Sequence, residues 1–233
     1  MTQQRVRLTM LLGMMFLTPA LAAAASGPEI LQGQCTSCHA LTKPADASMD
    51  RLLSRKGPDL WYAGVKFNKD WLVQWLQSPT VIRPAGVMYR NAVKPSGAGT
   101  TDAIDPAQVP AHMKLGAADA GAVADALLAL GADAGLVAKG AFKQEAPNAM
   151  AALLFNKLRG CSSCHAAKPD APPHSGPELF TAGDRLQPDY VVEYTRDPQK
   201  FDPHIWMPKL ELTDGDIQKL TGYLMTLKQA GAQ

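Results

Sequence analysis

The sequence predicts an all-α chain built from two similar helical units in tandem. Apolar residues recur at helical steps of three and four, alternating strand patterns are nearly absent, and a long stretch of the chain is repeated. A length of 233 residues allows one large domain or two small ones. Hydrophobic residues make up 46% of the chain and charged residues 19%, a balance typical of folded globular proteins that argues against disorder.

The first 25 residues have the layout of a secretory signal peptide. Arg5 and Arg7 precede an apolar run over residues 8–21, and three alanines at 23–25 provide a small-residue cleavage site. The run is short for a bilayer span, and an uncleaved membrane anchor is the alternative. We therefore expect export to the periplasm and a mature chain that does not span the membrane.

The charge of the predicted mature chain is balanced. The whole chain carries 23 basic and 21 acidic residues, so removing Arg5 and Arg7 leaves 21 of each. The sequence also contains no cluster of Lys and Arg. This pattern argues against nucleic acid as a partner.

Two copies of a Cys-x-x-Cys-His motif define the repeat. The first copy spans residues 35–39 (CTSCH), and the second follows 126 positions later at residues 161–165 (CSSCH). Each copy is followed by Gly-Pro, then by Ala-Gly, and then by two aromatic residues four positions apart that a helix would place on one face. The Gly-Pro pairs are Gly57-Pro58 and Gly176-Pro177, and the aromatic pairs are Trp71 with Trp75 and Tyr190 with Tyr194.

Each unit ends with a methionine, a Lys-Leu pair and an amphipathic helical pattern. The first pattern contains Val123, Leu127 and Leu130, and the second contains Ile217, Leu220, Leu224 and Leu227. Thr213-Asp214 is a typical helix start, and Gly231 a typical residue beyond a helix end. The sequence therefore predicts an amphipathic helix at the end of each unit.

A segment rich in Gly and Ala over residues 131–147 separates the units. We predict a first domain over 26–138, a linker over 139–147 and a second domain over 148–233. The first domain is larger because residues 91–110 have the composition of a loop, which is compatible with a docking element or with a tolerated surface insertion. Each domain is small for a side-chain core and would gain stability from a large apolar insert.

The Cys-x-x-Cys-His motif is the attachment signal for c-type haem. Cysteines three positions apart lie on one side of a helical turn, where both can bond to the vinyl groups of one haem while the histidine offers Nε2 to the iron. The halves of a zinc ribbon lie much closer together than these copies, and a redox-active pair usually has a βαβ setting. Structural disulfides leave His39 and His165 unexplained. The sequence therefore predicts two covalently bound haem c groups.

With these motifs the chain resembles the class I c-type cytochromes, in particular dihaem members with two tandem domains, over essentially the whole mature sequence. The resemblance implies two small helical domains that each enclose one haem. It implies that His39 and His165 are proximal iron ligands and that Pro58 and Pro177 accept hydrogen bonds from their Nδ1 atoms. Such bonds fix the tautomer and orientation of a ligand. The implied attachment residues are Cys35, Cys38, Cys161 and Cys164.

The resemblance also implies a distal methionine before the last helix of each domain. In the second domain this is Met207, whose thioether would raise the haem potential. In the first domain Met113 matches by the Lys-Leu pair and the helical pattern after it, and Met88 matches by its spacing from preceding prolines. His112 is a third candidate. We choose Met113 and leave the other two open.

Two fully coordinated irons leave no site for a substrate. The sequence therefore predicts a single-electron carrier between a donor dehydrogenase or complex and an acceptor, with redox proteins as partners. One alternative is a dihaem redox enzyme, either a peroxidase or a dehydrogenase of small inorganic sulfur compounds, in which one iron keeps an open position. Another is a cytochrome subunit of a larger respiratory complex.

Overall fold

The structure, a computed structural model, describes residues 25–80, 82, 86–97, 102–131, 135–144, 149–172 and 175–229. These residues form ten α-helices and one small hairpin, and helix accounts for 48% of the structure, so the prediction of a mostly helical chain is confirmed. Of the predicted signal peptide, residues 1–24 lie outside the described residues. Within the described ranges, no helix combines the length and the apolar character needed to cross a membrane.

Most of the helices are short. The N-terminal half contains α1 (Gly27–Ile30), α2 (Met49–Ser54), α3 (Ala63–Lys66), α4 (Lys69–Gln77), α5 (Val87–Ala92) and α6 (Ala117–Leu128). The C-terminal half contains α7 (Ala149–Leu153), α8 (Ala182–Arg185), α9 (Pro188–Arg196) and α10 (Asp214–Thr226). One π-helical turn extends α1 over Leu31–Cys35, and another extends α7 over Leu154–Leu158.

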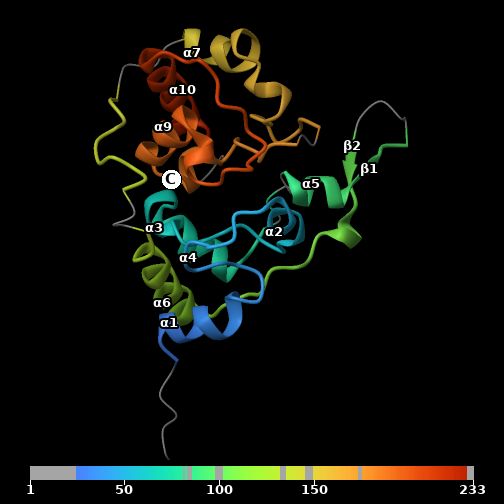
Figure 1. Ribbon diagram of the computed structural model, residues 1–233, viewed down its shortest axis with the longest axis vertical. Helices are drawn as coiled ribbons and strands as arrows, with labels where there is room; N and C mark the ends of the chain where they lie inside the picture. Colours follow the sequence, from blue (N-terminus) through green and yellow to red (C-terminus); the bar gives the residue numbers. More distant parts are fainter. Residues whose placement is uncertain are drawn as a thin grey trace, which may run out of the picture.

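The two halves repeat one packing arrangement. In the N-terminal half α1, α3 and α4 all contact α6, and in the C-terminal half α7, α8 and α9 all contact α10 (Figure 1). The contacts of α3 and α8 depend on glycine, because a Cβ at Gly64 would lie 2.2 Å from Leu128 O and a Cβ at Gly183 would lie 2.4 Å from Met225 O. Each of the two glycines donates its N–H to a carbonyl just beyond the end of the long helix, at 2.9 Å in both halves.

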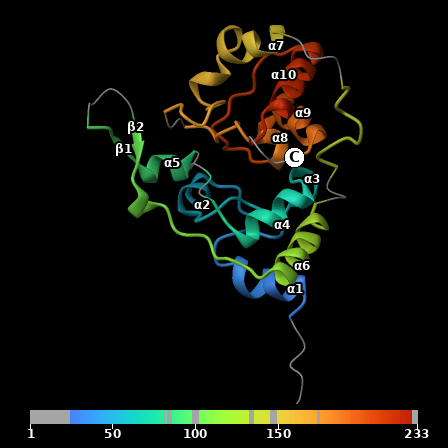
Figure 2. The same cartoon turned by 180° about the vertical axis from the view of Figure 1, so that it is seen from behind.

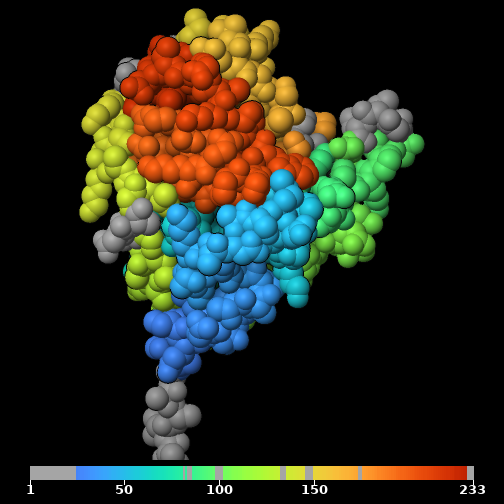
Figure 3. Space-filling model, viewed as in Figure 1, coloured from blue at the N-terminus to red at the C-terminus, as the bar shows by residue number. Residues whose placement is uncertain are grey.

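The halves meet along α3, α4, α8 and α9. In Figure 1 the C-terminal half lies above the N-terminal half, and Figure 3 shows the two in contact along a broad seam. Phe67 and Leu186 form an isolated antiparallel bridge across the seam, and both side chains are buried. Buried apolar residues of both halves belong to one continuous core, so the division into two domains stays a prediction.

The predicted helix signals agree with the structure at several positions. The rings of Trp71 and Trp75 stack on α4 with centroids 5.6 Å apart. Thr213 caps α10, because its hydroxyl accepts the N–H of Asp216 at 3.1 Å. The predicted apolar stripes of α6 and α10 are buried at Val123, Leu127, Ile217, Leu220 and Leu224. Leu130 and Leu227 follow the helix ends, and Gly231 lies outside the described residues.

The prediction of a loop over residues 91–110 was wrong in part. The segment contains the end of α5, the antiparallel strands β1 (Val93–Pro95) and β2 (Asp102–Ile104), and a 3₁₀ turn at Pro106–Gln108. Figures 1 and 2 show this hairpin projecting from the body of the molecule. A hydrogen bond from the Tyr89 hydroxyl of α5 to the Asp102 carboxylate holds β2. Composition could not predict this contact, because it depends on a residue outside the segment.

The described part of the predicted linker, residues 139–144, is bound to the C-terminal half. The backbone N–H groups of Gly140 and Phe142 both donate to the Asp189 carboxylate at 2.8 Å. The N–H of Lys143 donates to the Gln218 side chain at 2.8 Å, which connects the segment to α10. Residues 139–144 therefore pack along α9 and α10, and residues 145–147 lie outside the described part of the chain.

Candidate functional site

The two Cys-x-x-Cys-His motifs share a pair of backbone hydrogen bonds. The carbonyl of Cys35 accepts N–H bonds from Cys38 and His39 at 3.1 and 3.0 Å, and the carbonyl of Cys161 accepts the equivalent pair at the same distances. All four cysteines of the chain lie among the described residues, and each is a free thiol. Burial raises the pKa of the first thiol in each motif, at Cys35 and Cys161.

Each motif histidine is oriented by a proline carbonyl. The Nδ1 atom of His39 lies 2.7 Å from Pro58 O, and the Nδ1 atom of His165 lies 2.8 Å from Pro177 O. A carbonyl only accepts, so Nδ1 carries the proton and Nε2 carries the lone pair in both neutral rings. Burial lowers the pKa of His39 although the bond to Pro58 opposes it, which favours the neutral ring that a metal requires.

The glycine before each proline provides the space for the imidazole. A Cβ at Gly57 would lie 2.7 Å from Cε1 of His39, and a Cβ at Gly176 would lie 2.7 Å from Cε1 of His165. Both separations are shorter than any real Cβ contact. The Gly-Pro pair therefore has two roles, since the glycine admits the ring and the proline fixes its tautomer.

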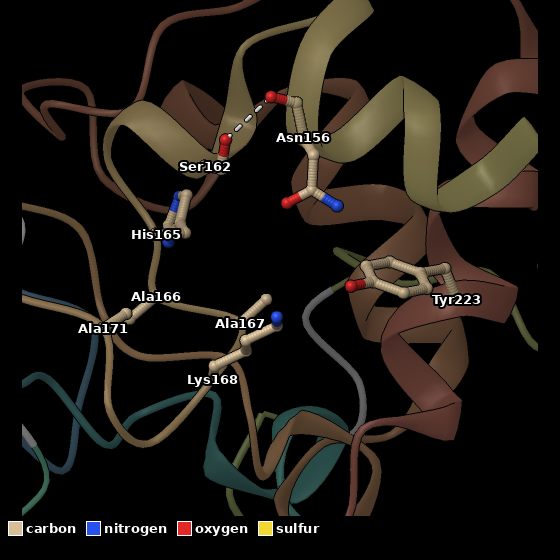
Figure 4. Close-up of a pocket in the computed structure, with 8 residues that line it drawn as sticks. All are labelled: Asn156, Ser162, His165, Ala166, Ala167, Lys168, Ala171 and Tyr223. Atoms are coloured by element: carbon tan, nitrogen blue, oxygen red, sulfur yellow. Dashed lines mark hydrogen bonds between the residues drawn. The ribbon is translucent and has the colours of Figure 1, made fainter.

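A pocket of about 220 Å³ lies against the second motif. Figure 4 shows His165 on one side of this pocket and Tyr223, which comes from α10, on the other. The Ser162 hydroxyl donates to the backbone carbonyl of Asn156 at 3.0 Å and ties the motif to the turn before it. The remaining lining residues are Ala166, Ala167, Lys168 and Ala171. The pocket therefore joins the second histidine to the last helix of the same half.

A second pocket, of about 290 Å³, is lined by residues 36–39 of the first motif and by a group of charged side chains. Arg51 of α2 and Arg55, the residue that follows α2, contribute to its lining with Asp59, and Arg51 forms a 2.5 Å ion pair with Asp59. Arg55 also pairs with Asp202 of the other half at 3.0 Å. The Nε atom of Arg55 is buried and has no hydrogen-bond partner among the described residues. Arg55, which lines this pocket, therefore keeps one unused buried donor.

The candidate distal residues lie in different settings. Met207 is half-buried, and its carbonyl accepts a 2.9 Å bond from the amide of Gln199. Met113 has 37% of its surface exposed, and its carbonyl accepts a 2.9 Å bond from Nδ1 of His112. Met88 lies on α5 and is half-buried. The rings of His112 and His39 lie 6.3 Å apart, so His112 is close to the first motif.

Sequence reasoning did not single out Arg51 and Arg55. They lie four residues apart before Gly57-Pro58, with Arg51 on α2 and Arg55 at its C-cap in an extended conformation. That spacing was a usable signal, because Asp59 follows the same proline and pairs with both side chains. Without a known position for α2, the two arginines could not be distinguished from ordinary charged residues that face solvent.

The side chains at both motifs are of the types that could hold a covalently attached haem. The thiols could bond to its vinyl groups and the imidazoles could bind its iron, and at the first motif Arg55 could pair with a carboxylate. The described residues contain no group of three His, Cys, Asp or Glu side chains placed to hold a metal ion. A macrocycle that supplies four nitrogen donors needs only axial side chains. No protein-family model matches the chain, and no curated protein matches it.

Proposed function

We propose that this protein is a dihaem c-type cytochrome that carries single electrons in the periplasm. Two tandem class I cytochrome c domains would each attach one haem, through Cys35 and Cys38 in the first and Cys161 and Cys164 in the second. The observation that carries the proposal is the duplicated motif in which each histidine is bound through Nδ1 to a proline carbonyl, at 2.7 and 2.8 Å.

The role of the chain in this proposal is to hold, orient and shield two redox groups. A bound haem supplies an iron that takes up and releases one electron. His39 and His165 would be the proximal ligands, and their bonds to Pro58 and Pro177 fix the nitrogen that faces the metal. Arg51 and Arg55 would offer positive charge to a haem carboxylate at the pocket beside the first motif. Met207 is the proposed distal ligand of the second haem.

A carrier is favoured over a dihaem redox enzyme by the supply of distal ligands. Met207 in the second half and His112 or a methionine in the first half could occupy the remaining coordination position of each iron. No open position would then be left for peroxide or a sulfur compound. The partners would then be redox proteins, and a place within a larger respiratory complex is compatible with this role. The projecting hairpin β1–β2 is an accessible element for such docking.

The proposal is tested by producing the exported chain in a host that matures c-type cytochromes. Intact mass and the alkaline pyridine spectrum should give two covalent haems per chain, and Cys35→Ala with Cys38→Ala should leave one. A colourless product with the mass of the bare polypeptide would refute the proposal. The carrier role requires low-spin spectra for both haems, reversible one-electron titration and no turnover of peroxide or thiosulfate. High-spin haem with turnover would support the enzyme instead.

A further inference from the structure

We propose that His112 is the distal ligand of the first haem, which would make that haem a bis-histidine site. This inference rests on the proposed function and replaces the methionine that the sequence pattern favours at that position. It starts from the two imidazoles that the structure brings together in the N-terminal half, those of His39 and His112.

The separation of the two rings matches the space that one metal ion needs. Their centroids lie 6.3 Å apart. An imidazole nitrogen binds a metal ion at about 2.0–2.1 Å, so two imidazoles on opposite sides of one ion have ring centres roughly 6–6.5 Å apart. The planes are inclined by 47°, which is compatible because each ring can rotate about its own metal–nitrogen bond. The pair is too far apart for a direct hydrogen bond, and no direct bond between the rings explains the arrangement.

The polar contacts of His112 repeat those of His39. Nδ1 of His112 lies 2.9 Å from the carbonyl of Met113, just as Nδ1 of His39 lies 2.7 Å from Pro58 O. In both rings the carbonyl fixes the proton on Nδ1 and leaves the lone pair on Nε2. An Nδ1–H bond to a backbone carbonyl is the usual companion of metal binding through Nε2. Both rings therefore have the tautomer of a ligand.

Neighbouring residues hold His112 in this position. The ring packs against Trp75 of α4, with centroids 4.5 Å apart. The indole N–H of Trp75 donates to Thr80 O at 3.0 Å, which fixes the ring that supports the histidine. Three residues later the N–H of Leu115 donates to Leu76 O at 3.0 Å and anchors the chain to the same helix. The segment that carries His112 is thus attached to α4 both through its ring and through its backbone.

The adjacent methionine contributes to this arrangement through its main chain. His112 and Met113 are both exposed, so exposure does not distinguish the two side chains. The backbone carbonyl of Met113 is the acceptor that orients His112. We infer that the contribution of Met113 is made by its main chain, which a side-chain substitution would leave intact. This difference gives the experiment a matched pair of neighbouring residues.

The test uses the full-length protein with both haems and compares His112→Ala with Met113→Ala and Met88→Ala. Intact mass first establishes two haems in every variant, so that loss of haem, which would refute the proposed function as well, is separated from a change of ligand. We expect His112→Ala to convert one of the two ferric haems from low spin to high spin, so that half of the low-spin signal is lost. Added imidazole should restore the low-spin signal. Met113→Ala and Met88→Ala should leave the spectrum unchanged.

A second variant gives an independent result without leaving the site empty. His112→Met should add a second methionine–Fe(III) near-infrared band to the one assigned to Met207, and it should raise the midpoint potential of the first haem, because a thioether favours Fe(II). The proposal is overturned if His112→Ala keeps two low-spin haems. It is also overturned if Met113→Ala or Met88→Ala removes a methionine band or produces the high-spin signal.

Discussion

Asn68 and Gln187 occupy equivalent positions in the two halves of the chain, and each binds the backbone of the opposite half. The Asn68 amide donates to the carbonyls of Asp184 and Leu186 at 2.9 and 3.3 Å. The Gln187 amide donates to the carbonyls of Gly64 and Phe67 at 2.9 and 2.7 Å. The seam is therefore self-complementary, as in a two-fold dimer, although both sides belong to one polypeptide.

We predict that Gln187→Ala destabilises the protein by about 1–3 kcal/mol, because the carbonyls of Gly64 and Phe67 lose their donor at a covered seam. The free energy of unfolding from urea denaturation measures the effect. Gln77→Ala is the matched control, since the Gln77 amide donates to Val73 of its own helix, at 2.9 Å. Equal losses in the two variants would contradict a special role of the seam.

We predict that Gly57→Ala impairs the first haem site. The added Cβ would lie 2.7 Å from Cε1 of His39 and 3.2 Å from Cys38 O, so the ring or the motif must move. The expected result is a smaller fraction of chains carrying two covalent haems, together with loss of low-spin signal from one of them. Gly121→Ala is the control, because a Cβ there meets nothing within 4 Å on α6. Normal haem content in Gly57→Ala would contradict the proposal that Gly57 provides the space for the His39 ring.

The sequence predicted the parts of the molecule that carry a local pattern. The apolar steps of three and four residues identified the buried faces of α6 and α10, and the repeated motif identified the two histidines that the structure orients alike. Phe67 and Asn68 gave no signal for the seam, because their partners lie more than 100 residues away and no periodicity connects them. Long-range pairing of this kind is visible only in three dimensions.

The same reason explains the missed parts of the site. His112 was one of three candidates in sequence, and its closeness to His39 depends on Trp75 and on the path of the chain after the hairpin. Arg55 has an ordinary helical setting in sequence, yet in the structure it pairs with Asp202 of the other half. The repeated motif therefore singled out His39 and His165, whereas the sequence left the distal candidates of the first half unresolved.

We predict that Met207→Ala removes the methionine–Fe(III) near-infrared band and lowers the midpoint potential of one haem by on the order of 0.1 V, since loss of the thioether removes its preference for Fe(II). Gln199 holds the Met207 carbonyl at 2.9 Å, so the loop should keep its backbone position without the side chain. Met49→Ala is the control, because Met49 is 44% exposed on α2. A band that persists in Met207→Ala would exclude Met207 as the ligand.

The last prediction concerns Lys66, whose ammonium lies over three aromatic rings at the seam. The Nζ atom lies 5.5 Å from the ring of Tyr62, 4.9 Å from Phe67 and 5.7 Å from Tyr190. Burial lowers the pKa of Lys66 from 10.5 to about 8, and the nearby guanidinium groups of Arg185 and Arg55 act in the same direction, while Asp59 opposes them.

The pKa of Lys66, 10.5 in the unfolded chain and about 8 in the folded chain, sets the direction in which stability changes with pH. Between pH 8 and pH 10.5 the unfolded chain keeps the Lys66 proton and the folded chain has released it, so the free energy of unfolding gains a contribution that rises with pH. Below pH 8 both states are protonated, and the folded state carries the full cost of a buried ammonium. Lys66→Met has no such group, so its stability should lack this contribution.

We therefore expect the stability of the wild-type protein relative to Lys66→Met to increase as the pH rises from about 7 to about 10, measured by urea denaturation at each pH. The buried tyrosines at the seam, Tyr62 and Tyr190, have raised pKa values, so they reduce stability only above about pH 10, beyond the range of this comparison. Lys43→Met is the control, because Lys43 lies exposed over Trp61. Parallel pH curves for wild type and Lys66→Met would contradict a buried, perturbed ammonium at the seam.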